Sequence, residues 1–265
     1  TLGAEIDSDE VSALLLCGSY ARGTATRYSD VDFARIVRTP PQGKEQRYFY
    51  RDGLLISVVT WSLEFIQESS AKPELAIWMI PCLREARILL DKEGAFSALQ
   101  QGLAAFRWET LQEQANAWAS DALMLFAVVV QKALGALLNQ DETALAYATQ
   151  ELFYSLTWAL AVQRGVLIEG GNSYYDQVQE AAGKDSAWIH AHRQILCLDP
   201  FPEQLLPVQA RGIAALRLYQ ETAWLLRDAI LPQDCEVIDQ TLQIIEEASL
   251  AKGRQTISPL ARLWL

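Results

Sequence analysis

The chain has 265 residues, 51% of them hydrophobic, and a formal net charge of −11. That length allows one large domain or two smaller ones, and the apolar content predicts a packed core and excludes bulk disorder. The acidity disfavours a nucleic-acid backbone as the main partner, because phosphate contacts need clustered Lys and Arg. Residues 1–94 carry a net charge of −3 and residues 95–265 a net charge of −8. This is compatible with a cationic small substrate, and equally with acidity that only favours solubility.

The four cysteines lie far apart in the sequence and include no Cys-x-x-Cys pair. Neither a zinc site nor a disulfide framework is therefore predicted, and reduced thiols in a cytoplasm fit best. The longest uninterrupted apolar run, residues 122–130, has nine residues and falls well short of a membrane span. We therefore expect a cytoplasmic protein with no membrane partner.

The first seventy residues predict a small mixed sheet. A short apolar run over residues 11–16, closed by Gly18, indicates a buried strand, and the polar stretch 19–28 fits a turn followed by a short helix. A second strand follows over 31–37. The stretch 47–61 predicts a hairpin whose turn is the dipeptide Asp52-Gly53.

Helical patterns dominate the rest of the chain. Ser62 is a plausible N-cap, and helical periodicity continues in part over 75–90, with an interruption at Pro81. The polar stretch 91–94 marks a domain boundary. Beyond it lie four long helical patterns, at residues 106–138, 142–166, 208–230 and 234–250. We predict an α+β protein, with a sheet domain at 1–94 and an all-α helical bundle at 95–265.

Chemistry is indicated most strongly where Gly18-Ser19 ends one strand and, ten residues later, Ser29-Asp30-Val31-Asp32 opens the next. Asp30 and Asp32 are two apart and point to the same face of a strand, which suits Mg²⁺ bound by two carboxylates plus substrate phosphates. Gly18 lets a phosphate approach the backbone, and Ser19 adds a hydroxyl and an amide at the start of a helix.

These residues resemble the DNA polymerase β-like nucleotidyltransferase superfamily, and most closely its small bacterial members, the aminoglycoside and minimal nucleotidyltransferases. The resemblance includes Ala21-Arg22-Gly23 and covers about 25 residues. It implies a triphosphate held by Gly18 and Ser19. Ser29 is a further nucleotide-binding candidate, and either Arg22 or Arg27 would neutralise a phosphate oxygen, with Arg22 the residue we select. It also implies Mg²⁺ held by Asp30 and Asp32, and a cleft that a second copy of the chain often completes in related enzymes.

The sequence departs from the family pattern at the third carboxylate, which the family usually takes from the middle of a later strand. The matching position within residues 54–61 is Ser57. Either another acid fills the role, or the chain is catalytically weak or inactive. Glu64 lies just beyond the strand and is a candidate for the missing acid. The simpler interpretation is a solvated residue in a first helical turn.

Glu151 begins a Glu-Leu-Phe stretch similar to that of kanamycin-type nucleotidyltransferases, in which a glutamate of the helical domain is the general base. A surface acid on a helix is the alternative. His190 and His192 have no nearby Cys, Asp or Glu at the spacing of a metal site, so we expect surface imidazoles rather than a zinc site. The polar, aromatic loop 170–176 either borders the substrate site or is a plain connection between helices.

The reaction that the resemblance implies is Mg²⁺-dependent transfer of a nucleoside monophosphate from an NTP to a hydroxyl of a small acceptor such as an aminoglycoside, with release of pyrophosphate. The alternative is an antitoxin-like protein that binds nucleotide, or a partner, without turnover. Ser57 keeps this alternative open.

Overall fold

The computed structural model describes residues 8–39, 45–202 and 205–254. It divides into two compact units: Thr1–Leu111 with Leu167–Tyr174, and Gln112–Val166 with Tyr175–Leu265. The first unit therefore runs past the boundary expected at Gly94. Helix α5 (Ala95–Ala104) belongs to it because Phe96 and Leu103 are buried in the core beside the sheet.

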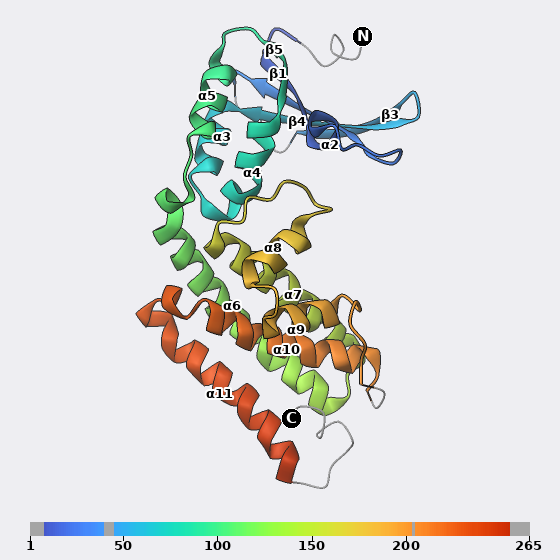
Figure 1. Cartoon of the computed structure of the whole chain (residues 1–265), viewed down its shortest axis with the longest axis vertical. Helices are drawn as coiled ribbons and strands as arrows, with labels where there is room; N and C mark the ends of the chain where they lie inside the picture. The colour runs from blue at the N-terminus through green and yellow to red at the C-terminus, as the bar shows by residue number, and fades with distance from the viewer. Residues whose placement is uncertain (1–7, 40–44, 203–204, 255–265) are drawn as a thin grey trace. The chain divides into compact units, whose positions relative to one another are not determined.

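The first unit is built on a five-stranded mixed sheet in the order β3-β4-β2-β1-β5 (Figure 1). The pair β2–β4 is parallel and the other three pairs are antiparallel. The bounds are β1 Val11–Cys17, β2 Val31–Val37, β3 Gln46–Arg51, β4 Leu54–Ser62 and β5 Arg87–Asp91. The predicted mixed sheet and α+β class are confirmed.

Local sequence explains the β3–β4 hairpin and the helix that follows it. Asp52 and Gly53 both have positive φ, 52° and 79°, as the two central residues of a type I′ turn require. The Ser62 side chain accepts a hydrogen bond from the backbone N–H of Phe65 at 3.1 Å. Ser62 is thus the N-cap of α3 (Leu63–Ser70), as predicted.

One face of the sheet packs against helices α3, α4 (Pro73–Glu85) and α5. Leu15, Ala34 and Ile36 from the sheet contact Ile80 and Phe96 from the helices, and all are almost fully buried. The opposite face carries a smaller apolar cluster. The β3–β4 hairpin extends past these helices (Figure 1), so the sheet face near β3 is open to solvent.

The prediction of helical structure over residues 75–90 is wrong for its last residues. Helix α4 ends at Glu85, and Ala86 has extended backbone angles (φ −61°, ψ 134°). Residues 87–91 then form β5, which pairs with β1. The side of β1 that does not face β2 offers backbone hydrogen-bonding groups, and local periodicity does not reveal such a partner. Pro81 does not interrupt α4, since the helix continues through it.

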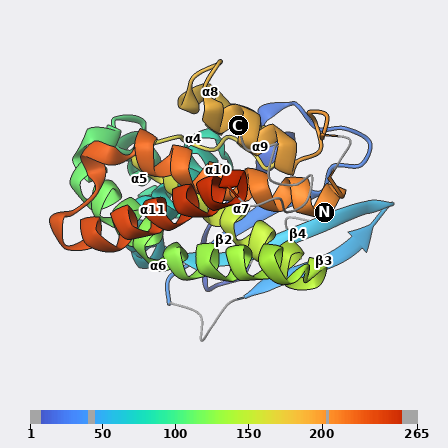
Figure 2. The same cartoon turned by 90° about the horizontal axis from the view of Figure 1, so that it is seen from below.

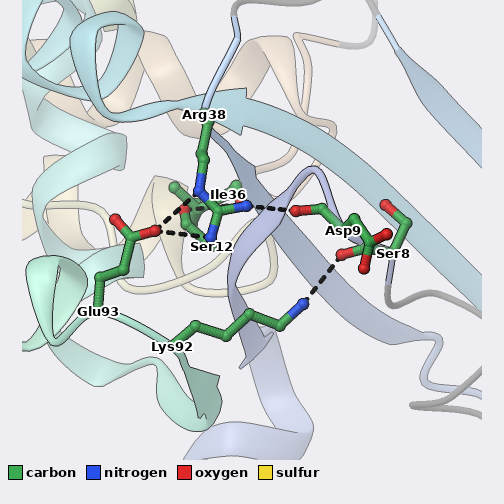
Figure 3. Close-up of polar contacts among 7 residues, drawn as sticks. All are labelled: Ser8, Asp9, Ser12, Ile36, Arg38, Lys92 and Glu93. Carbon is green, nitrogen blue, oxygen red and sulfur yellow. Dashed lines mark hydrogen bonds and ion pairs between the residues drawn. The ribbon is translucent and has the colours of Figure 1, made fainter.

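Polar contacts tie the sheet together at its end remote from Gly18 (Figure 3). The Arg38 guanidinium pairs with Glu93 at 2.6 Å and donates a hydrogen bond to the carbonyl of Asp9. Lys92 Nζ donates to the carbonyl of Ser8 at 2.9 Å, and buried Ser12 Oγ donates to the carbonyl of Ile36 at 3.0 Å. These contacts fix the start of β1 and the end of β2.

The second unit is helical. Its elements are α6 Gln112–Asn139, α7 Glu142–Arg164, α8 Tyr174–Ala182, α9 Ala187–Ile195, α10 Pro207–Leu225 and α11 Pro232–Arg254. The four long helices were predicted, whereas α8 and α9 were not, because each is only nine residues long. Helix α6 packs along α7 and α11 (Figure 2).

Helix α6 is also linked to the start of α11 by hydrogen bonds. Ser120 Oγ donates to Asp234 Oδ2 at 2.6 Å and accepts from the Leu231 N–H at 2.8 Å. By length and composition alone, the helical stretch Trp108–Asn139 passes a test for a membrane span, and 44% of its apolar window is buried. Its packing against α7, α10 and α11 accounts for the buried part of that apolar character.

Candidate functional site

The site begins with a row of residues that crosses the sheet. Asp32 in β2 is paired with Cys17 in β1 on one side and with Ser57 in β4 on the other. Ser57 is in turn paired with Tyr48 in β3. Residues paired across neighbouring strands point to the same face, so the four side chains share the helix-packed face of the sheet.

The Gly18-Ser19 turn is built directly against Asp32. Gly18 has φ +64°, a conformation that favours glycine, and a Cβ at this position would overlap the Asp32 carboxylate. The short helix α2 (Gly18–Arg22) follows and ends at Gly23, which has φ +75°. The sequence prediction that this turn and Asp32 lie together is therefore correct in geometry, and the reason is the close approach of the Gly18 backbone.

Electrostatics at Asp32 show that the two aspartates interact. Burial, and then repulsion from the Asp30 carboxylate, raise the pKa of Asp32 above its ordinary value. A hydrogen bond from the Ser57 hydroxyl and the positive charge of Arg22 oppose this rise in the pKa. The arrangement carries excess negative charge on half-buried oxygens, and a cation bound there would relieve it.

Ser57 occupies the place where the third carboxylate was expected. Its side chain is only 6% exposed and its hydroxyl donates to Asp32. Among residues 8–39, 45–202 and 205–254, no three or more His, Cys, Asp or Glu side chains form a group that could hold a metal ion. Two carboxylates still fit Mg²⁺, which is commonly bound by one or two carboxylates plus substrate phosphates.

Arg22 is the cation whose charge lowers the pKa of Asp32. Its Nη1 lies 3.4 Å from Glu85 Oε2 at the end of α4. On its other side lies Gly170, where an added Cβ would stand 3.0 Å from Arg22 Nη2. The predicted site residue Arg22 is therefore placed beside the turn, held between α4 and the segment Leu167–Tyr174 of the same unit.

Ser29 has a local role that the sequence did not indicate. Its Oγ accepts a hydrogen bond from the Thr26 N–H at 2.8 Å, and its own N–H donates to the Thr26 carbonyl at 3.1 Å. Ser29 thus shapes the turn that delivers Asp30. Its contact with a nucleotide stays a prediction. Arg27 is exposed, with its guanidinium over the ring of Tyr28 at 5.6 Å.

Two further candidates lie on helices. Glu64 is exposed in the first turn of α3. Glu151 is half-buried on α7 in the helical unit, and its role as a base stays a prediction.

The expectation of a surface imidazole is wrong for His192, which is fully buried and stacked on Trp188 with ring centroids 4.7 Å apart. The reason is that both residues lie on the buried face of α9. His190 is exposed, as predicted.

Three features near the site were missed by sequence reasoning. Tyr48 and Tyr50 are 59% and 77% exposed and alternate along β3, so they share the face of Asp32 and Ser57. Cys82 in α4 forms a hydrogen bond with Cys17, and this bond with burial raises the pKa of the Cys17 thiol. Glu85 pairs with Arg22. Only the alternation of Tyr48 and Tyr50 left a signal in the sequence, since the other two contacts are long-range.

The sheet, the glycine turn and the neighbouring aspartates agree with the sequence resemblance to nucleotidyltransferases. In agreement, residues 4–75 match the family model described as "Nucleotidyltransferase domain". This match agrees with the predicted superfamily over those residues. The narrower resemblance to aminoglycoside-acting members stays a prediction.

Two individual proteins are similar to the chain. A protein of Methanocaldococcus jannaschii named "Putative protein adenylyltransferase" is 38% identical over 61 residues, covering 19% of this chain and 42% of the relative. The chain thus matches less than half the length of that protein. The crystal structure of a nucleotidyltransferase-like protein from Exiguobacterium sibiricum aligns with 92% of this chain and 87% of that one, at 13% identity and a TM-score of 0.47.

Proposed function

We propose that the protein transfers a nucleoside monophosphate from an NTP to a hydroxyl group, with release of pyrophosphate. The observation that carries this proposal is the contact of Gly18 with the Asp32 carboxylate, with Asp30 near enough to raise the pKa of Asp32. A turn that exposes backbone amides beside two carboxylates suits a triphosphate with its counter-ion. The match to a nucleotidyltransferase family model supports the same reaction.

In this proposal Asp30 and Asp32 hold Mg²⁺, which would neutralise charge on the phosphates as the bond to the leaving group breaks. Gly18 and Ser19 bind the β- and γ-phosphates through backbone amides and the Ser19 hydroxyl. Arg22 binds a phosphate oxygen from the same side. A cation held by the two carboxylates would attract the α-phosphate to the start of β2.

The strand order gives the proposed reaction a direction. The Gly18-Ser19 turn follows β1, on one side of Asp32, while β4 and β3 lie on the other side. In an in-line displacement the acceptor approaches opposite the leaving group. Pyrophosphate would therefore leave toward α2, and the acceptor would lie over Ser57 toward Tyr48, roughly 10 Å from Asp32 at the usual strand spacing.

The acceptor we favour is a small hydroxylated molecule, with aminoglycosides as the first candidates because of the sequence resemblance and the acidic chain. The name of the archaeal relative adds the hydroxyl side chains of proteins to the acceptors worth testing. A nucleotide-binding protein without turnover is the second candidate. The observation that favours it is the Ser57 hydroxyl, which is a poor substitute for a carboxylate as a base or metal ligand.

A screen for pyrophosphate release tests the reaction. ATP, GTP, CTP and UTP would each be supplied with Mg²⁺ and with aminoglycosides, polyols or a protein mixture as acceptors. The double variant Asp30→Ala with Asp32→Ala should abolish release, while Glu68→Ala with Glu74→Ala removes the same charge from α3 and α4 and should not. Turnover that persists without both aspartates would refute the site. NTP binding without any turnover would favour the second candidate.

A further inference from the structure

Arg22 lies in the last turn of α2, at the junction of three segments of the first unit. Its guanidinium contacts Glu85 through a single 3.4 Å distance, and the two side chains are 24% and 34% exposed. Its charge also reaches Asp32, whose pKa it lowers. The only acceptor recorded for Arg22 within the described residues is thus a half-exposed carboxylate, while the proposed phosphate site lies next to it.

The segment Leu167–Tyr174 restricts where the guanidinium moves. It is anchored on α4 by a 2.7 Å hydrogen bond from the Ile168 N–H to the Ile77 carbonyl. Ser173 Oγ and N–H both donate to the Gly170 carbonyl at 3.2 Å, which shapes the turn. Gly170 faces Arg22 closely enough that a Cβ would stand 3.0 Å from Nη2.

We propose that Glu85 is the resting partner of Arg22, and that Arg22 exchanges Glu85 for the triphosphate when nucleotide binds. This inference rests on the proposed function, because it assumes a triphosphate at the Gly18-Ser19 turn. Glu85 is in this view a positioning residue that acts through Arg22. The ligand class is a polyphosphate anion, recognised independently of its base.

The strengths of the two interactions favour exchange of Arg22 to the phosphate over a permanent Arg22–Glu85 ion pair. A half-exposed ion pair with one long contact contributes about 0–1 kcal/mol. A hydrogen bond from arginine to a phosphate oxygen is charge-assisted and roughly twice as strong as a neutral one. The triphosphate therefore outcompetes Glu85 for Arg22. Since Glu85 must release Arg22 before the anion binds, it opposes binding.

The test measures the dissociation constants of MgATP and of Mg²⁺ with inorganic tripolyphosphate by titration calorimetry. Glu85→Gln keeps the size of the side chain and removes its charge, and it should bind both ligands about threefold to tenfold more tightly. Glu74→Gln, at the other end of α4, is the matched control for net charge and should leave both constants unchanged. A merely structural role for Glu85 would weaken binding instead.

A double-variant cycle tests whether Glu85 acts through Arg22. In the Arg22→Ala background, Glu85→Gln should change the affinity by less than about twofold, because no cation is left to release. An equal gain in both backgrounds would refute exchange and indicate simple repulsion. Unchanged or weaker binding in Glu85→Gln would refute the inference while the nucleotide site stands. If the natural protein binds neither ligand, the proposed function itself fails, and the inference with it.

Discussion

Ser57 lies directly across from Asp32 in the parallel register of β2 and β4, and its hydroxyl donates a hydrogen bond to the Asp32 carboxylate. A serine therefore stands where the family pattern has its third carboxylate. The hydroxyl stabilises the ionised form of Asp32 and adds no negative charge. We propose that this pair determines whether the domain catalyses nucleotidyl transfer or only binds nucleotide.

Ser57→Asp should create the missing acid. Because position 57 is in register with Asp32, the new carboxylate would face the same ligand, and we expect pyrophosphate release to rise at least tenfold over the natural protein, an order-of-magnitude value for one added metal ligand. The free protein should lose about 1–3 kcal/mol of stability, since a third carboxylate joins two others at a buried position. The control is Ser57→Asn, with similar size and no charge. Equal release from both variants would contradict this role for position 57.

Asp32→Asn should stabilise the free protein while abolishing MgATP binding. The pKa of Asp32 is raised, so the folded state favours the protonated carboxyl, and the ionised form at neutral pH costs stability. The expected gain is a few tenths to about 1 kcal/mol, because solvent screens a half-exposed carboxylate. The free energy of unfolding of the natural protein should therefore rise as the pH falls through the raised pKa of Asp32. This pH dependence should be absent in Asp32→Asn. Thermal unfolding against pH measures both effects. A destabilised Asp32→Asn would contradict the assignment.

Gly18→Ala and Gly23→Ala separate backbone strain from close approach. Both glycines have positive φ, so both variants should lose about 1 kcal/mol of unfolding free energy. Only at Gly18 would the methyl group overlap Asp32, whereas Gly23 has open space. Gly18→Ala should therefore lose MgATP affinity as well, and Gly23→Ala should keep it. Denaturant titration and calorimetry give the two quantities. Equal affinities would show that the Gly18 contact is not needed for binding.

Gly170→Ala and Gly171→Ala test whether the segment Leu167–Tyr174 positions Arg22. A methyl on Gly170 would press on the guanidinium at 3.0 Å, while one on Gly171 meets nothing within 4 Å. Arg22 is held on its other side by Glu85, so we expect MgATP affinity to fall about threefold or more in Gly170→Ala only, the scale of one weakened charged hydrogen bond. Equal effects of the two substitutions would remove the segment from the site.

His192 should make the stability of the helical unit depend on pH. Burial lowers the pKa of His192 to about 4, whereas an unfolded histidine titrates near 6.5. The unfolded state therefore binds more protons between these values, and stability should fall by up to about 3 kcal/mol as the pH drops through this window. His192→Gln should flatten this dependence, and His190→Gln, at an exposed position, should not. Urea unfolding at several pH values provides the measurement. A slope that survives in His192→Gln would assign it to other groups.

Several elements could be predicted because their causes are local. The Asp52-Gly53 turn, the Ser62 cap and the long helices each follow from residues a few positions apart. The strand β5 could not, because it is five residues long and is defined by pairing with β1. His192 was misjudged although a signal existed: Trp188 and His192 are four apart and share one face of α9.

The sequence by itself indicated that a glycine turn and two neighbouring aspartates lie close together at strand ends of a small sheet, since only ten residues separate Ser19 from Asp30. Only the tertiary structure decided what surrounds them. It placed Ser57 beside Asp32 through a parallel pairing, and it brought Glu85 and Gly170 to either side of Arg22. Contacts between residues so far apart depend on how whole elements pack, and no short-range pattern records them.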